Sequence, residues 1–229
     1  MITPTDLVSD ILKKLSETGI LKIIMLIGSW CLIVYQDYFE NSPMIPVFRT
    51  TDIDFMIPNP PKIVTHVDVP RILETLGFKE EVDEINEVVK YLHRDLEIEF
   101  LIPEVGPSKS KNPYISELKI IPQRLRYLNI LQSYQLKSHF KGIPVIVPEP
   151  AAFVIQKFIS SAERKNPEKR DNDLRIATEL GFFLLTIHEQ AQKLTEIYQS
   201  IPQKWGKRFL RIIEADSRKF FEIFNGIIK

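Results

Sequence analysis

Residues 21–30 of the chain read LKIIMLIGSW, and residues 49–55 read RTTDIDF. The first stretch is an apolar run that ends at Gly28, which indicates a buried central strand over 21–27 followed by a turn. After Gly28 and Ser29 we expect a helix that continues to about residue 39. Backbone N–H groups at such a strand-to-helix turn, with the Ser29 hydroxyl beside them, are suited to binding a phosphate.

The second stretch contains two aspartates separated by one residue. Residues 48–57 alternate between apolar and polar side chains, which predicts a strand with Asp52 and Asp54 on the same face. Two carboxylates side by side repel each other unless a cation neutralises them. Their hard oxygen atoms favour Mg²⁺ or Mn²⁺, so the pair is a predicted metal site. Arg49, just before it, has two interpretations: it steadies a phosphate, or it pairs with Asp52.

A third acid is expected on a neighbouring strand. Residues 87–93 and 96–102 are predicted to form two strands joined by a tight turn. Glu97 and Glu99 share one face of the second strand. With two metal ions about 3.5–4 Å apart, a third carboxylate can activate the attacking hydroxyl. We take Glu99 as this residue and Glu97 as the alternative. The competing explanation for both is a solvated hairpin in an acidic region.

The rest of the chain divides into two halves of different character. In the first half we expect helices over residues 6–15 and 68–77 and a β-hairpin over 134–147. The second half is helical, with helices predicted over residues 152–163, 169–185, 188–198 and 204–224. The pattern predicts an α+β fold, in which helices pack on a small mixed sheet and an all-α region follows. The predicted domains are 1–148 and 149–229.

These motifs resemble the DNA polymerase beta-like nucleotidyltransferase superfamily. In that superfamily a hydrophobic strand, Gly-Ser or Gly-Gly, a helix, Asp-x-Asp and a later acidic residue follow one another. The second half is similar to the helical region of a poorly characterised bacterial nucleotidyltransferase family. The matching residues there are VPEPA (147–151), Phe153, QKF (156–158), Arg164 and KRDNDL (169–174). Together the two resemblances cover about residues 20–185.

The resemblance implies a role for each matching residue in the first half. Gly28 and Ser29 would contact the triphosphate. Asp52 and Asp54 would be catalytic metal ligands, and Glu99 would be the third such carboxylate. The implied cofactor is Mg²⁺ or Mn²⁺.

The resemblance also implies nucleotide contacts from the second half. Lys157 and Arg164 would reach the phosphates or the base. Arg49, from its own place just before the aspartates, is a further candidate for nucleotide binding. Seven residues are close to two helical turns, so we expect Lys157 and Arg164 on one face of one helix. A surface position for Lys157 is the plainer alternative.

Composition narrows the remaining classes of protein. Thirty basic and thirty acidic residues give a formal net charge of zero, so nothing in the bulk charge points to nucleic acid or a membrane. The chain has one cysteine, Cys31, which fits a reducing compartment, and we expect a cytoplasmic protein without a membrane span. The four histidines lack metal-ligand spacing, so zinc is not expected.

The expected function is a metal-dependent nucleotidyltransferase. It would move a nucleoside monophosphate from a nucleoside triphosphate to a hydroxyl and release pyrophosphate. The acceptor is open: a protein side chain, an RNA end or a small molecule. The alternative is a non-catalytic module that binds nucleotide or a protein partner, such as one half of a toxin–antitoxin or phage-defence pair.

Overall fold

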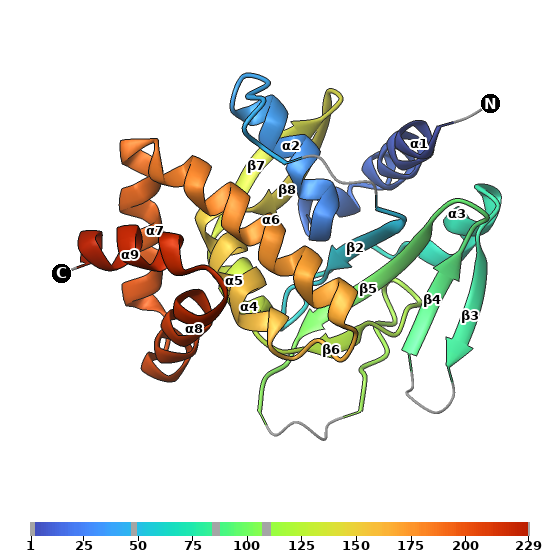
Figure 1. Cartoon of the computed structure of the whole chain (residues 1–229). Coiled ribbons are helices and arrows are strands. Elements are labelled where there is room, and N and C mark those ends of the chain that lie inside the picture. Colours follow the sequence, from blue (N-terminus) through green and yellow to red (C-terminus); the bar gives the residue numbers. More distant parts are fainter. Residues whose placement is uncertain (1–2, 47–49, 84–87, 107–110, 229) are drawn as a thin grey trace. The chain divides into compact units, whose positions relative to one another are not determined.

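The computed structural model describes residues 3–46, 50–83, 88–106 and 111–228 of the chain (Figure 1). It divides into two compact units, which we call the α/β unit and the helical unit. The α/β unit comprises Met1–Asn41 and Val47–Pro148, and the helical unit comprises Ser42–Pro46 and Glu149–Lys229. Among the described residues no helix is both long and apolar enough to cross a membrane.

The α/β unit contains a sheet of six strands, a two-stranded hairpin and four α-helices among its described residues. In chain order its elements are α1 (Pro4–Glu17), η1 (Ile20–Lys22), β1 (Met25–Ile27), η2 (Gly28–Trp30), α2 (Cys31–Tyr38), β2 (Asp52–Met56), α3 (Val69–Thr75), β3 (Lys79–Asp83), β4 (Val88–Leu92), β5 (Glu97–Pro103), β6 (Gln123–Leu125), α4 (Leu128–Ser133), β7 (Gln135–Phe140) and β8 (Ile143–Pro148).

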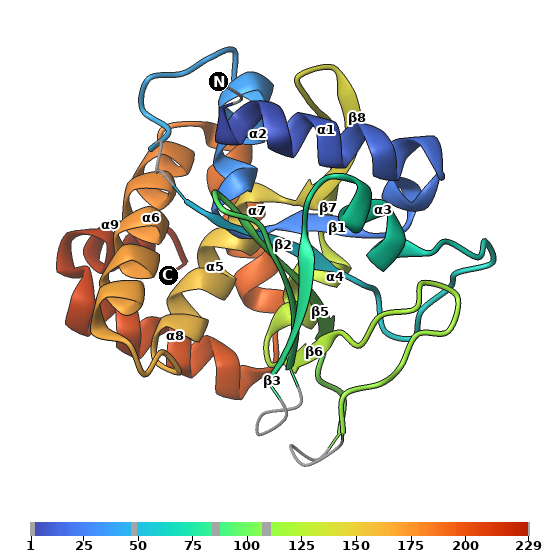
Figure 2. The ribbon, with the colours of Figure 1, turned by 90° about the vertical axis from the view of Figure 1, so that its right-hand side faces the viewer.

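The sheet is mixed and has the strand order β1-β2-β5-β4-β3, with β6 paired to β5. Strands β2 and β5 run parallel, whereas β1 is antiparallel to β2 and β4 is antiparallel to β5. Two segments distant in sequence, residues 52–56 and 97–101, therefore lie side by side in register. The helices α1 and α3 pack against each other in this unit (Figure 2).

One face of the sheet is apolar and forms the core. Ile53 and Phe55 on β2 are fully buried, as is Ile98 on β5. The Phe55 ring stacks on Phe100 with centroids 5.6 Å apart, and Tyr91 from β4 meets Phe100 edge-on at 5.9 Å. Because side chains alternate along a strand, burying this face turns the intervening polar residues to the other one.

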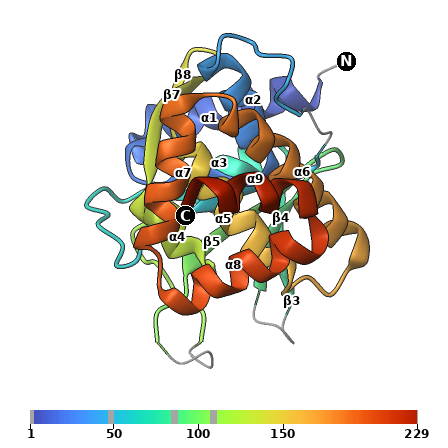
Figure 3. The ribbon, with the colours of Figure 1, turned by 60° about the vertical axis from the view of Figure 1, so that its left-hand side comes forward.

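The helical unit is built around α5 (Figure 3). Its helices are α5 (Pro150–Ser161), α6 (Pro167–Leu185), α7 (His188–Ser200), α8 (Gln203–Asp216) and α9 (Arg218–Ile228). Helices α6, α7 and α8 all contact α5. Phe209 of α8 and Phe224 of α9 meet edge-on at 5.5 Å, so aromatic rings join the last two helices.

The expected α+β architecture is confirmed, and so are several of its elements. The helix expected over 68–77 is α3, and the Asp68 carboxylate caps it by accepting a hydrogen bond from the Arg71 amide at 3.1 Å. The hairpin expected over 134–147 is β7 and β8, and its turn places Lys141 and Gly142 at φ of 47° and 80°.

Other boundaries differ from the expectation. The strand expected over 21–27 is reduced to β1, because Lys22 is exposed and Ile20–Lys22 form a 3-10 turn. The strand expected over 48–57 is observed over Asp52–Met56, and residues 47–49 lie outside the described part. The single helix expected over 204–224 is two helices, because the backbone turns at Ser217, where φ is −146° and ψ is 60°.

Candidate functional site

The site begins where β1 ends. Ile27 is the register partner of Asp54, so Gly28 follows directly beside that aspartate. Gly28 has a φ of +73°, and a Cβ atom added to it would lie 2.2 Å from Asp54 Oδ2. An L side chain at this position would be strained and would also collide with the carboxylate. The glycine therefore lets the turn and the carboxylate approach each other closely.

The turn after β1 has the predicted form. Residues Gly28–Trp30 make one 3-10 turn that continues directly into α2. Gly28 and Ser29 are half-buried, and Cys31 behind them is fully buried with its Sγ atom donating to the Leu26 carbonyl at 3.3 Å. The buried start of α2 thus holds the Gly-Ser turn against the end of β1.

Asp52 and Asp54 lie on the polar face of β2, as the alternation predicts. Both are half-buried, and both neighbours of Asp54 on the strand are fully buried. The Thr51 hydroxyl donates to Asp52 Oδ1 at 3.1 Å, and the Asp52 amide donates to the Thr50 hydroxyl at 3.3 Å. These contacts fix the backbone where β2 begins, next to the Asp52 carboxylate.

Strand β5 brings two more acids to the same face. Asp52 is the register partner of Glu97, and Asp54 is the register partner of Glu99. Neighbouring strands are about 4.8 Å apart, and directly paired residues project on one side of the sheet. The structure therefore brings Gly28, Asp54 and Glu99 together across three adjacent strands.

Lys90 of β4 extends this row. It is the register partner of Glu99, and its Nζ atom lies 2.5 Å from Glu99 Oε1. The same ammonium forms an ion pair and hydrogen bond with Glu97 Oε1. Lys90 is thus a residue of the site that the sequence argument did not include. The available signal was its place between the buried Val89 and Tyr91, which puts it on the polar face of its strand.

Burial and the neighbouring charges both shift the pKa values of Glu99 and Lys90. Burial raises the pKa of Glu99 above its ordinary value, Lys90 pulls it down, and Glu97 adds to the rise, with a net rise. Burial alone would lower the pKa of Lys90, but its hydrogen bonds to Glu97 and Glu99 outweigh this effect and raise it. Lys90 is therefore held in its charged form.

The predicted residues of the second half meet each other within the helical unit. Lys157 Nζ lies 2.5 Å from Asp173 Oδ1, and Arg164 Nε lies 2.7 Å from Asp173 Oδ2. The Lys157 and Asp173 side chains are 9% and 5% exposed, and Arg164 is 42% exposed. Burial tends to raise the pKa of Asp173, yet the two cations hold it below its usual value.

One part of the expectation for these residues is wrong. Lys157 is on α5, but that helix ends at Ser161, so Arg164 lies in the connection to α6 and not on the same helical face. The side chains still converge, through Asp173 of α6. Contacts of Lys157 and Arg164 with a nucleotide stay a prediction, and Arg49 lies outside the described residues.

The carboxylates suit a divalent cation by their chemistry. Asp52 and Asp54 offer hard oxygen donors from one face, and the missing side chain of Gly28 leaves backbone close to Asp54. Within the described ranges, no set of three His, Cys, Asp or Glu side chains is placed to hold one metal ion. That Glu99 also ligates the metal stays a prediction.

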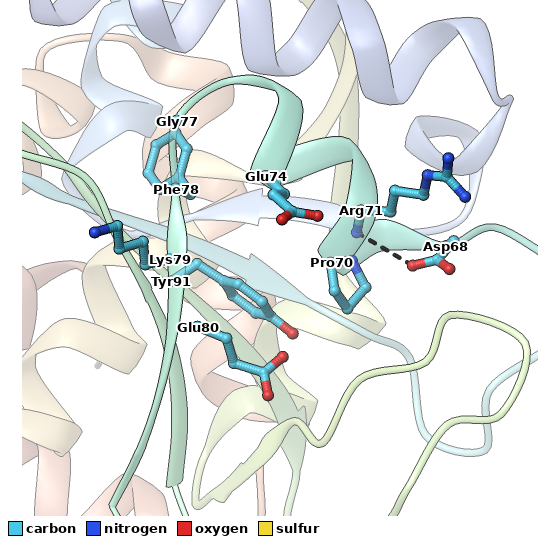
Figure 4. A pocket seen from close by; sticks show the side chains of 9 residues that line it. All are labelled: Asp68, Pro70, Arg71, Glu74, Gly77, Phe78, Lys79, Glu80 and Tyr91. Carbon is cyan, nitrogen blue, oxygen red and sulfur yellow. Dashed lines mark hydrogen bonds between the residues drawn. The ribbon is translucent and has the colours of Figure 1, made fainter.

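A cavity of about 800 Å³ lies at α3, β3 and β4 (Figure 4). Tyr91, Glu80 and Glu74 are among the residues that line it. Tyr91 is 2% exposed, and burial raises its pKa, with nearby Glu80 adding to the rise. Because Tyr91 follows Lys90 directly on β4, it points to the opposite face of the sheet. The cavity is therefore separate from the row of acids.

Comparison with protein families gives a match over most of the chain. The model of a family described as "Nucleotidyltransferase" matches residues 6–203. The match includes the Gly-Ser turn, the Asp-x-Asp strand, β5, and the α5–α6 region. A comparison with curated proteins found no match.

Several solved structures are similar at low sequence identity. The solution structure of the antibiotic-resistance factor ANT(2'')-Ia is 12% identical over 97% of this chain and 89% of that one, with a TM-score of 0.42. An antigenic nucleotidyltransferase-like protein from Paracoccidioides brasiliensis is 13% identical over 97% and 92%, with a TM-score of 0.48. ANT(2")-Ia in complex with adenylyl-2"-tobramycin is 16% identical over 76% and 86%, with a TM-score of 0.44.

Proposed function

The chain belongs to the nucleotidyltransferase family, and we propose that it transfers a nucleoside monophosphate from a nucleoside triphosphate to a hydroxyl group, with release of pyrophosphate. We further propose that the reaction depends on Mg²⁺ or Mn²⁺ and that the family lies within the DNA polymerase beta-like superfamily. A nucleotidyltransferase needs both a nucleotide substrate and an acceptor.

The approach of Gly28 to Asp54 is the observation that supports this proposal most. A phosphate-binding turn and a metal-binding carboxylate act on the same substrate only if they are adjacent. Here the missing Cβ of the glycine lets them be adjacent, since a side chain would reach to 2.2 Å from Asp54 Oδ2. A glycine required only by a tight turn would show the positive φ without that contact.

Asp52 and Asp54 are the proposed metal ligands, and Gly28 and Ser29 are proposed to hold the phosphates. When bound, the metal would neutralise charge on the triphosphate and polarise its phosphoryl oxygens. Without the metal, the β2 carboxylates would repel the triphosphate, because both carry negative charge. Their geometry on one strand face supports a shared ligand.

Glu99 is proposed to orient the acceptor and accept its proton. In this step the acceptor oxygen forms a bond to the α-phosphorus, and the bond from that phosphorus to the bridging oxygen breaks. Pyrophosphate takes the bonding electrons away, and the hydroxyl proton passes to a Glu99 carboxylate oxygen. The raised pKa of Glu99 suits a proton acceptor. Glu97 remains the alternative for this role.

Contacts from three further residues complete the proposed nucleotide site. Arg49, Lys157 and Arg164 are proposed to add positive charge near the phosphates or the base. Of the last two, Arg164 is the more exposed, at 42% against 9% for Lys157. Replacing each by alanine and measuring triphosphate binding by calorimetry tests them separately. A loss of about tenfold or more in affinity is expected for a direct charged contact.

Pyrophosphate release tests the proposal directly. The full chain is incubated with each α-labelled triphosphate, Mn²⁺ and, in turn, protein, RNA and small-molecule fractions. Label transfer and pyrophosphate release are expected for the wild type. Asp54→Asn should reduce both at least about a hundredfold, the size of a missing electrostatic catalytic group.

Asp171→Asn is the matched control, because this aspartate is on α6 and its side chain is 76% exposed. It should leave activity unchanged. Tight triphosphate binding without pyrophosphate release from any acceptor would contradict the proposal. That result would favour a non-catalytic binding module, and co-purification with a second protein would identify its partner.

A further inference from the structure

A row of charged residues crosses three strands of the sheet in register. Lys90 of β4 pairs with Glu99 of β5, and Glu99 pairs with Asp54 of β2. Two residues earlier on each of these two strands, Glu97 pairs with Asp52. Since directly paired residues share a face, four carboxylates and one ammonium stand on the same side of the sheet.

Lys90 contacts the two β5 carboxylates of this group. Its Nζ lies 2.5 Å from Glu99 Oε1 and is also bonded to Glu97 Oε1. The three side chains are partly shielded, with 37%, 28% and 21% exposure for Lys90, Glu97 and Glu99. The ammonium therefore occupies the position between the β5 carboxylates in which any cation would be bound by both.

We propose that Lys90 is a positioning residue that takes the place of a second metal ion. It neutralises Glu97 and Glu99 and keeps both out of metal coordination. The site then holds one divalent cation, on Asp52 and Asp54. Glu99 keeps its Oε2 atom for the acceptor hydroxyl. This inference rests on the proposed function and adds the number of metal ions that the site requires. It replaces the expectation that Glu99 is a metal ligand.

The charge of Lys90 decides whether a second divalent cation can bind at Glu97 and Glu99. A divalent cation that approached Glu97 and Glu99 would meet the Lys90 ammonium already in contact with them, and like charges repel. Without the ammonium, two adjacent carboxylates would be left uncompensated, and such a pair binds a divalent cation. Removing the lysine charge should therefore create a metal site, whereas loss of a merely structural ion pair would not.

Mn²⁺ titration of the full chain without nucleotide, followed by electron paramagnetic resonance of the unbound ion, measures this number. We expect one Mn²⁺ per chain for the wild type and two for Lys90→Met, which removes the ammonium but keeps an unbranched side chain only one atom shorter. Lys90→Arg keeps the charge and should bind one ion. Lys119→Met is the matched control, because Lys119 pairs with Asp68 at 2.6 Å away from the acidic row, and it should also bind one ion.

Glu99→Gln gives a second measurement should Lys90→Met not fold. Because Glu99 is inferred not to ligate the metal, this variant should keep one Mn²⁺ with an affinity within about threefold of the wild type. An unchanged ion number in folded Lys90→Met, or loss of Mn²⁺ in Glu99→Gln, would overturn the inference. Asp54→Asn separates the two proposals. If Asp54→Asn still binds the Mn²⁺ of the wild type, the proposed metal site is wrong. If Asp54→Asn loses that ion and folded Lys90→Met binds one Mn²⁺ instead of two, only the inference about Lys90 is wrong.

Discussion

Gly28 is the residue whose substitution tests the site most sharply. In Gly28→Ala the new Cβ would be 2.2 Å from Asp54 Oδ2, so the carboxylate or the turn must move. The positive φ adds a backbone cost of about 1–2 kcal/mol. We expect at least a tenfold loss of Mn²⁺ affinity and of transfer activity, measured by Mn²⁺ titration and pyrophosphate release.

Gly19→Ala separates the contact from the strain. Gly19 has a φ of +79°, and a Cβ added there would meet nothing within 4 Å. This variant should lose similar stability in urea unfolding yet bind Mn²⁺ like the wild type. Equal Mn²⁺ affinity in both alanine variants would show that the approach of Gly28 to Asp54 is unimportant.

Single residues of the site differed in how well the sequence predicted them. Asp52, Asp54 and Glu99 alternate with apolar neighbours, and this alternation predicted correctly that each lies on the polar face of its strand. The register that joins β2 to β5 is set by parallel pairing across more than forty residues, which local patterns do not encode. Lys90 faces Glu99 through a different pairing, the antiparallel β4–β5 hairpin. The register of a hairpin is fixed by its turn, so the tight turn expected between residues 93 and 96 already contained this pair.

At the scale of elements, the contact of α5 with α6 contains a buried charge cluster. Asp173 accepts from Lys157 and Arg164, and its carboxylate is 5% exposed. Removing one partner of a buried ion pair costs about 3–5 kcal/mol, because the remaining charge is left uncompensated. We therefore expect Asp173→Asn to lower the free energy of unfolding by about that amount at pH 7. Urea unfolding followed by circular dichroism measures it.

The same cluster predicts a dependence on pH. The two cations lower the pKa of Asp173 in the folded state below its ordinary value, so folding is favoured when the carboxylate is ionised. The stabilisation is present above the unfolded pKa near 4 and is lost as pH falls through the lower folded pKa. The stability gap between wild type and Asp173→Asn should therefore shrink below about pH 4. Asp171→Asn, at an exposed site on α6, should show no such gap.

Helices and strands with a regular spacing of apolar residues were predicted better than polar elements or elements interrupted by a break. The apolar stripe of residues 188–198 and the caps of α3 predicted these helices. Strand β3 gave no signal, because all five of its side chains are exposed and its alternation has no buried face. The break between α8 and α9 lacks Pro or Gly, and it allows Phe224 to return to Phe209. Tertiary packing of this kind is not visible in local sequence.

At the scale of the whole molecule, the proposed site predicts that triphosphate stabilises the fold only when the metal ion is present. Bare carboxylates repel phosphates, so triphosphate with a chelator should leave the melting temperature unchanged. With Mn²⁺ and triphosphate at about a hundredfold their dissociation constant, binding adds about 2.7 kcal/mol. For a chain of this size that is a rise of roughly 5–10 °C in differential scanning calorimetry.

Asp54→Asn provides the control for this experiment. It should show no rise with metal and triphosphate together, whereas Asp171→Asn should respond like the wild type. If the two units melt separately, the transition of the α/β unit is the one expected to move, because it contains Asp52 and Asp54. An equal rise with and without chelator would mean that the acids do not form the metal site.

The buried thiol of Cys31 makes the start of α2 chemically observable. It is the single cysteine of the chain, it is 0% exposed, and it lies two residues after Ser29. A disulfide reagent can reach the Cys31 thiol only while β1 and α2 are transiently apart. The rate at which the thiol is labelled therefore measures how often this opening occurs. Each 1.4 kcal/mol of opening free energy slows labelling about tenfold relative to an unfolded chain. A ligand held by Gly28 and Ser29 should slow the labelling further. The native cysteine can thus be used, without any substitution, to measure whether a ligand is bound at the Gly-Ser turn.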